Sequence, residues 1–331
     1  MRELLNQKCR LFIKNRDAMK SAFPMENSYM HAICSSIISS EDRIADIQAL
    51  KETRRMLKSR VNAFSNFRGA CELPVVAMLD IDSDPEWRLD KAIELYKSLK
   101  EHFFTSEYLP MAAIILSGMT EQANVAERTR KIYDLMKKEH PFLTSSEDCV
   151  FAAMLAMSPR SDEDLIRDVE ICYNILKERF YDRNAVQSLS HVLALADSER
   201  EGAADRCRDT MRLFELLKEK KHKYGAGYEL PTLGVLATLP CGIDETVSDL
   251  IEVSDFLKTQ KGYGFFGFDR TQRMMHAGMI VSSERIGASK TMEGAAVSGT
   301  LAMIAAQQAA TCAAISVSMA ASAAASSAAR G

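Results

Sequence analysis

The fold is decided by the stretch 74–99, which reads PVVAMLDIDSDPEWRLDKAIELYKSL. Its first part, 74–79, carries no charge and opens with a proline, a residue that suits the first turn of a helix. After a polar turn, Asp84 can cap a second helix and Pro85 can begin it. The second helix has one apolar face, because apolar residues recur at three- and four-residue steps, at Leu89, Ile93, Tyr96 and Leu99. The stretch therefore predicts a short buried helix, a tight turn and a long amphipathic helix.

The same pair of helices recurs along the chain about seven times. Short, nearly uncharged segments begin near residues 30, 74, 110, 150, 190, 231 and 275, at intervals of 36 to 44 residues. Long charged helices are expected between them, at 41–61, 84–99, 122–139, 161–179, 201–222 and 244–260. A period near forty is typical of helical-hairpin arrays. We predict an all-α fold of repeated helix-turn-helix pairs, either an open α-solenoid or a closed helical-hairpin array.

The C-terminal part of the chain departs from this pattern. From Gly294 to Ala329 no residue is charged, and alanine, serine and glycine dominate. We expect a repeat domain at 1–285 and an Ala/Ser-rich helical tail at 286–331. The tail is long enough to span a bilayer but poor in the large apolar residues on which insertion depends. Docking on the body or on a second copy is favoured over membrane packing or partial disorder.

Composition restricts the classes of partner and the compartment. The net charge of -3 argues against nucleic-acid binding, and the densest basic cluster, around 218–223, suits the end of a helix. The eight cysteines contain no C-x-x-C pair, and most lie among apolar neighbours. The first residues lack a secretory signal pattern. These features favour a cytoplasmic protein, with a membrane-peripheral position as the alternative through 294–329.

No motif predicts a cofactor or a metal site. The run 80–84 opens like a calcium loop, but Pro85 and Lys91 stand where the EF-hand requires glycine and a bidentate glutamate. We therefore interpret it as a helix cap. The chain also has no H-E-x-x-H, P-loop or G-x-S-x-G pattern.

Three histidines occupy similar places in their short helices, His31, His191 and His276. If those helices lined one surface, the imidazoles could bind a ligand or move protons. The simpler interpretation, which we favour, is that each ring satisfies a backbone carbonyl between repeats.

Two loops combine glycine, aromatic residues and arginine. Asn66 and Arg68 precede a short helix, where a cation beside free backbone N–H groups could hold an anion. Tyr263, Asp269 and Arg270 belong to the Gly-aromatic loop 261–268 and the residues after it. The interpretation that we favour over ligand binding is structural, with Arg68 and Arg270 forming ion pairs with carboxylates between repeats. These loops are still the best candidate binding zone, because binding residues concentrate in loops.

Several stretches resemble a bacterial family, domain of unknown function 4003, found mainly in Firmicutes. They are the run Ser28–Ala32, the segment Phe64–Gly69, the helix start Ser106–Pro110 and the ending with Gln307 and Gln308. The resemblance covers nearly the whole chain. It implies a bacterial, cytoplasmic protein and assigns no catalytic residue.

The sequence favours a binding role over an enzymatic one. Helix-pair arrays commonly hold a protein, a peptide or a small ligand on a concave or central surface. A homo-oligomer is also possible, since the tail 286–331 could pair with a second copy. The alternatives are an enzyme with a cavity lined by the short helices, and a membrane-associated protein tethered by its tail.

Overall fold

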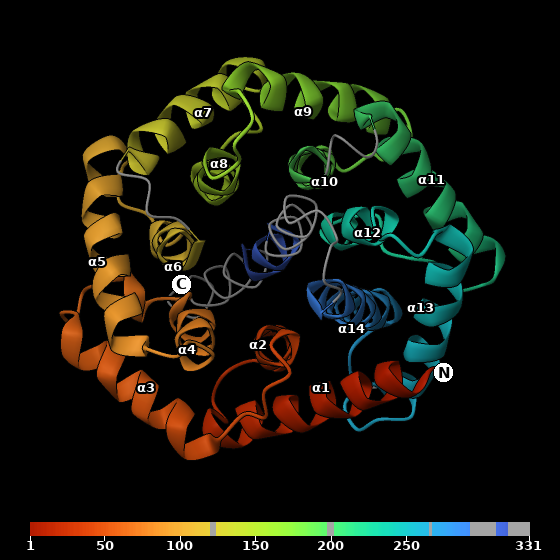
Figure 1. Ribbon diagram of the computed structural model, residues 1–331, viewed down its shortest axis with the longest axis horizontal. Helices are drawn as coiled ribbons and strands as arrows, with labels where there is room; N and C mark the ends of the chain where they lie inside the picture. The colour runs from red at the N-terminus through yellow and green to blue at the C-terminus, as the bar shows by residue number, and fades with distance from the viewer. Residues whose placement is uncertain (120–123, 197–201, 265–266, 292–308, 317–331) are drawn as a thin grey trace, which may run out of the picture. The chain divides into compact units, whose positions relative to one another are not determined.

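The computed structural model describes residues 1–119, 124–196, 202–264, 267–291 and 309–316, and every regular element within them is a helix. The long helices are α1 (Glu3–Ala22), α3 (Ile47–Arg60), α5 (Pro85–His102), α7 (Val125–Glu139), α9 (Asp162–Leu176), α11 (Ala203–Glu219) and α13 (Ile243–Lys258). The short helices between them are α2 (Ser28–Ser40), α4 (Glu72–Asp80), α6 (Leu109–Met119), α8 (Cys149–Ala156), α10 (Arg183–Leu195) and α12 (Leu230–Ala237). The predicted all-α fold of repeated helix pairs is confirmed (Figure 1).

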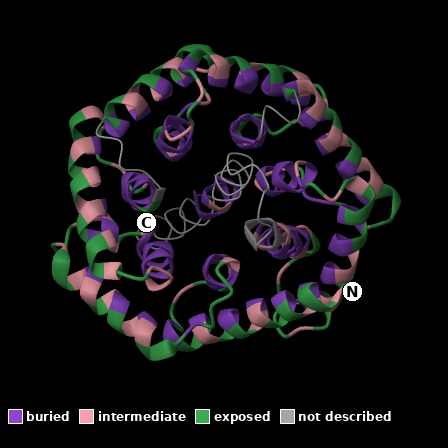
Figure 2. Cartoon of the chain, in the orientation of Figure 1, coloured by how far each residue is buried: buried purple, intermediate pink, exposed green. Residues whose placement is uncertain are grey.

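The long helices bury one face, as their sequence pattern predicts. In α5 the side chain of Asp84 accepts a hydrogen bond from the Trp87 N–H at 3.0 Å, and Pro85 opens the helix. The run 80–84 thus includes a helix cap. Leu89 and Leu99 are fully buried on the inner face. Figure 2 shows the same alternation of buried and exposed residues along each long helix.

The short helices are buried on all sides. Every residue of α8 and of α12 is buried, and so is every residue of α4 except Asp80 at its end. A helix buried all round has no face on which a charge could reach water, which explains why these segments are nearly uncharged. In place of a seventh short helix, α14 (Arg270–Thr291) is 22 residues long.

The helices form two compact units. The first comprises Met1–Lys14, Ser39–Asp42 and Glu163–Ala313, and the second comprises Asn15–Ile38, Arg43–Asp162 and Ala314–Gly331. In the second unit α4, α6 and α8 are seen end-on in Figure 1 while α3, α5 and α7 are seen lengthwise, so short and long helices cross steeply. The first unit repeats this arrangement with α10 and α12 against α9, α11 and α13.

The Ala-rich tail lies largely outside the described residues. Residues 309–316 are described, and they are helical and almost entirely buried. Among the described helices, none combines the length and the apolar character that a membrane crossing requires.

Candidate functional site

The Gly-aromatic loop of the first unit is anchored to α14 by a buried hydrogen bond. The Tyr263 hydroxyl and Nδ1 of His276 are 2.9 Å apart, and both side chains are at most 2% exposed. The His276 ring also packs edge-on against Phe268, with ring centroids 4.7 Å apart, and lies 6.1 Å from the Phe12 ring. Two of the predicted site residues, Tyr263 and His276, are therefore brought together within an aromatic cluster.

The smaller glycine-tyrosine loop, 224–228, lies beside the same helix. A Cβ atom at Gly278 of α14 would lie only 2.8 Å from the Tyr224 hydroxyl, so the loop and the helix are in close contact. Glu229, at the start of α12, is 4% exposed and accepts a hydrogen bond from the Gly227 N–H at 3.2 Å. A Cβ at Gly225 would collide with its carboxylate. The loop therefore needs glycine to enclose this buried acid.

The other two histidines lie in different units. His31 belongs to the second unit, where its Nε2 lies 2.9 Å from the Phe23 carbonyl oxygen, and burial lowers its pKa. A neutral His31 that donates to this carbonyl has the structural role that the sequence favoured. His191 is fully buried on α10 of the first unit.

Asn66 and Arg68 occupy a single 3-10 turn, Asn66–Arg68, before α4. The Asn66 side chain donates to the Ser106 carbonyl oxygen at 2.6 Å, which ties this loop to the next connection of the second unit. Arg68 is partly exposed. Asn66 is thus engaged in joining repeats.

Asp269 and Arg270 are both exposed at the start of α14. The Asp269 carboxylate accepts hydrogen bonds from the Gln272 N–H and the Thr271 hydroxyl, each at 2.8 Å. This is the geometry of a helix N-cap.

One buried acid of the second unit is strongly perturbed. Burial raises the pKa of Asp148 to about 7, although its carboxylate accepts a hydrogen bond from the Ser145 N–H at 2.7 Å. Burial also raises the pKa of nearby Tyr108 to about 12, with the charges of Glu147 and Glu107 adding to the effect. Asp148 closes a capping box at the 3-10 turn Ser146–Asp148, so a structural role accounts for its position. Within the described ranges, no three histidine, cysteine or acidic side chains are grouped as metal ligands would be.

A row of exposed apolar side chains has no counterpart among the features predicted from the sequence. Each long helix is followed by a connection to the next short helix, and in five successive connections one apolar residue stands almost entirely in solvent. These tip residues and their exposed fractions are Met25 (95%), Phe64 (96%), Phe104 (97%), Phe142 (99%) and Tyr181 (92%). They lie 38 to 40 residues apart, a more regular spacing than that of the short helices, so aligning the repeats on their loops would have found them.

Four of the tip residues belong to the second unit, where successive connections touch one another. Arg54 of α3 links the first connection to the start of α4, directly after the second connection, because it bonds to Glu26 at 3.1 Å and also to Glu72. The bond from Asn66 to Ser106 joins the second to the third. The third connection leads into α6 and the fourth leads into α8, and these two helices pack against each other. We call the surface formed by these four neighbouring connections of the second unit, with the tips Met25, Phe64, Phe104 and Phe142, the loop edge.

Comparison with known proteins places the chain in a family. The family model described as "Protein of unknown function (DUF4003)" matches residues 15–309. The chain belongs to the DUF4003 family. It is 26% identical over 294 residues to the uncharacterized protein YeaA of Bacillus subtilis (strain 168), and the aligned region covers 84% of each of the two chains. No solved structure matches.

The DUF4003 match contains the features described above. Residues 15–309 include all five tip residues, the Tyr263–His276 pair and Asp148. The resemblance read from the sequence is thus confirmed at the level of the family.

Proposed function

We propose that this DUF4003 protein is a binding protein and that the loop edge of its second unit is the binding surface. The supporting observation is the exposure of the tip residues. A protein surface contains many single apolar atoms, but a phenylalanine more than nine-tenths exposed at the same place in three successive repeats is not needed for folding. Phe64, Phe104 and Phe142 meet this description.

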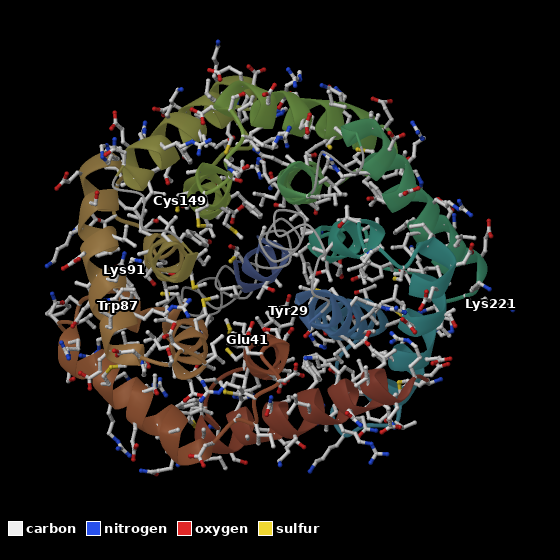
Figure 3. All side chains as sticks on the ribbon, viewed as in Figure 1. Tyr29, Glu41, Trp87, Lys91, Cys149 and Lys221 are labelled. Atoms are coloured by element: carbon white, nitrogen blue, oxygen red, sulfur yellow. The ribbon has the colours of Figure 1, made fainter. Side chains whose placement is uncertain are left out.

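Among the described residues, one further aromatic side chain is exposed, and it is partly covered. Trp87 of α5 is 53% exposed, and Lys91 lies over its ring with Nζ 4.8 Å from the ring centroid (Figure 3). The tips differ because their solvent exposure is nearly complete. Because almost all of its surface is in contact with water, such an apolar side chain contributes the most binding free energy when a partner buries it.

A cytoplasmic location and a docked tail complete the proposal. All eight cysteines are free and most are buried, which is compatible with a reducing compartment. Burial raises the pKa of the Cys71 thiol to about 12, so this side chain is inert toward disulfide exchange. The burial of residues 309–316 supports a tail, within 286–331, that docks on the body.

Photo-crosslinking tests the binding role. In the full chain, p-benzoylphenylalanine replaces Phe104 or Phe142 in living cells, with replacement of Leu4 as the matched control. Leu4 is 62% exposed on α1 of the first unit. We expect covalent adducts at both tip positions that are absent at Leu4. Equal labelling at all three positions, or no adduct with any cellular protein or lipid at the tips, would refute the proposal.

A further inference from the structure

The apolar side chains of the loop edge stand singly. Phe64, Phe104 and Phe142 are 96, 97 and 99% exposed, so no neighbouring side chain shields them or forms a pocket with them. Folded protein partners bind through contiguous patches in which apolar residues pack together and exclude water. A bilayer interface makes no such demand, because isolated aromatic rings can enter it at the level of the headgroups. The shape of the loop edge therefore fits a lipid surface better than a folded partner.

A cation accompanies every tip. Lys20 stands five residues before Met25, and a basic residue stands four residues before each later tip, at Arg60, Lys100, Lys138 and Lys177. A cation in the last turn of a long helix interacts favourably with the negative C-terminal end of the helix dipole, and this accounts for a basic residue there. It does not account for the apolar tip that follows each cation. Basic residues beside projecting aromatic residues are the combination that binds anionic lipid headgroups.

The acids of the same connections are partly withdrawn from solvent. Glu72 is buried and its carboxylate is paired with Arg54 and, at 3.1 Å, with Lys58. Asp148 is also buried. Arg60 is paired with Glu86 and Asp90 of α5. The exposed charges that remain free of these pairs are the cations Lys20, Lys100, Lys137 and Lys138 and the acids Glu101, Glu107 and Glu139.

The equivalent connections of the first unit continue the pattern. Tyr181 is 92% exposed and follows Lys177 by four residues. The next connection carries four exposed lysines at the end of α11 and just after it, Lys218, Lys220, Lys221 and Lys223. Connections of this one type therefore hold the exposed apolar tips and the densest basic cluster of a chain whose net charge is -3.

From these observations we infer that the loop edge of the second unit docks on an anionic lipid bilayer, with Phe64, Phe104 and Phe142 entering the interface and the adjacent lysines contacting the headgroups. This inference rests on the proposed function and specifies its partner. It differs from a tether through the tail, because the contact residues belong to the folded repeats.

Vesicle binding by the full chain tests the inference. Vesicles of phosphatidylglycerol mixed equally with phosphatidylcholine are compared with vesicles of phosphatidylcholine alone. We expect cosedimentation with the anionic vesicles that weakens in high salt. The triple variant Phe64→Ser/Phe104→Ser/Phe142→Ser is expected to bind about tenfold more weakly or worse. The matched control Leu4→Gln/Ile171→Gln, which removes exposed apolar residues outside the loop edge, should bind like the unaltered chain.

Tryptophan fluorescence reports whether a tip enters the interface. The chain has one tryptophan, Trp87, so Phe104→Trp in a Trp87→Phe background makes the tip the only emitter. A blue shift on anionic vesicles, together with quenching by brominated lipid, is the expected result. Far-UV circular dichroism of each variant separates loss of binding from loss of folding, because a nearly fully exposed phenylalanine contributes little to the core.

Three outcomes overturn the lipid inference. They are failure of the full chain to bind anionic vesicles, equal binding by the triple tip variant, and an unshifted spectrum at residue 104 in bound protein. If protein adducts form at the tips in cells while vesicles do not bind, the lipid inference fails and the binding role stands. If neither adducts nor vesicle binding occur, both fail.

Discussion

At the residue scale, two phenylalanines three positions apart differ completely in solvent exposure. Phe67 is 1% exposed and packs edge-on against Tyr96 with ring centroids 5.2 Å apart, whereas Phe64 is 96% exposed. The 3-10 turn at Asn66–Arg68 includes Phe67 and is capped by Ser65, so Phe64 falls outside it. Both residues are equally apolar in the sequence. Only the course of the loop decides which one is buried, and within a single loop no helical or strand periodicity of apolar residues predicts that course.

Asp148 gives a prediction about the dependence of stability on pH. Burial raises its pKa in the folded chain from the ordinary 3.8 to about 7. Its contribution to folding is therefore complete below pH 4 and is lost as the pH rises through 7, because the folded state then carries a buried charge. Asp148→Asn keeps an acceptor for the Ser145 N–H but cannot ionise. From pH 4 to pH 8 the variant should gain about 2 to 4 kcal/mol of unfolding free energy relative to the unaltered chain.

Urea unfolding at both pH values measures this difference. Glu101→Gln serves as the control, because Glu101 is exposed and its neutralisation should leave the pH dependence nearly unchanged. Parallel stability profiles for Asp148→Asn and the unaltered chain would mean that Asp148 is ionised at little cost.

At the element scale, most of the helix pattern follows from the sequence. The predicted apolar start at Pro74 lies within α4, although that helix begins two residues earlier, at Glu72. Pro231 is likewise preceded by one residue of α12. The difference has a simple cause, since no N–H in the first turn of a helix has an intrahelical partner and proline is tolerated at several of those positions.

Gly278 tests the contact between α14 and α12. A Cβ there would lie 2.8 Å from the Tyr224 hydroxyl and 2.9 Å from Cδ1 of Leu236, and both side chains are fully buried. Gly278→Ala should therefore lower the free energy of unfolding by about 1 to 3 kcal/mol, despite the better helix propensity of alanine.

Gly287 is the matched control in the same helix. Among the described residues, nothing lies within 4 Å of a Cβ at this position, so Gly287→Ala should raise stability by up to about 1 kcal/mol. Urea denaturation of both variants gives the comparison. Equal stability of the two alanine variants would show that α14 and α12 are packed less tightly around Gly278 than the distances to Tyr224 and Leu236 indicate.

At the scale of the whole molecule, the sequence predicts repeats but not which distant segments meet. Each unit is assembled from three separate parts of the chain. In the first unit, Arg2 bonds to Asp249 at 2.9 Å and to Glu284 at 2.7 Å. Many charged residues lie on the amphipathic helices along the chain, and their spacing in the sequence does not predict which of them form ion pairs with one another. The tip residues were missed for a related reason, since their shared position emerges only when successive loops are aligned.

Arg2 gives the prediction that belongs to this scale. Its guanidinium holds the carboxylates of Asp249 and Glu284, whose side chains are 6% and 5% exposed, and so joins the start of the chain to α13 and α14. Arg285 also pairs with Asp249, so removal of Arg2 leaves one cation in place. Arg2→Ala should lower the free energy of unfolding by about 1 to 3 kcal/mol, below the full cost of an unpaired buried charge. Arg10→Ala on the exposed side of α1, where Arg10 bonds to Asn6 at 3.3 Å, should cost less than about 0.5 kcal/mol in the same urea titration. If both variants lose equally little free energy of unfolding, the first unit is held together by apolar packing. The carboxylates of Asp249 and Glu284 then have sufficient hydrogen-bond partners without Arg2.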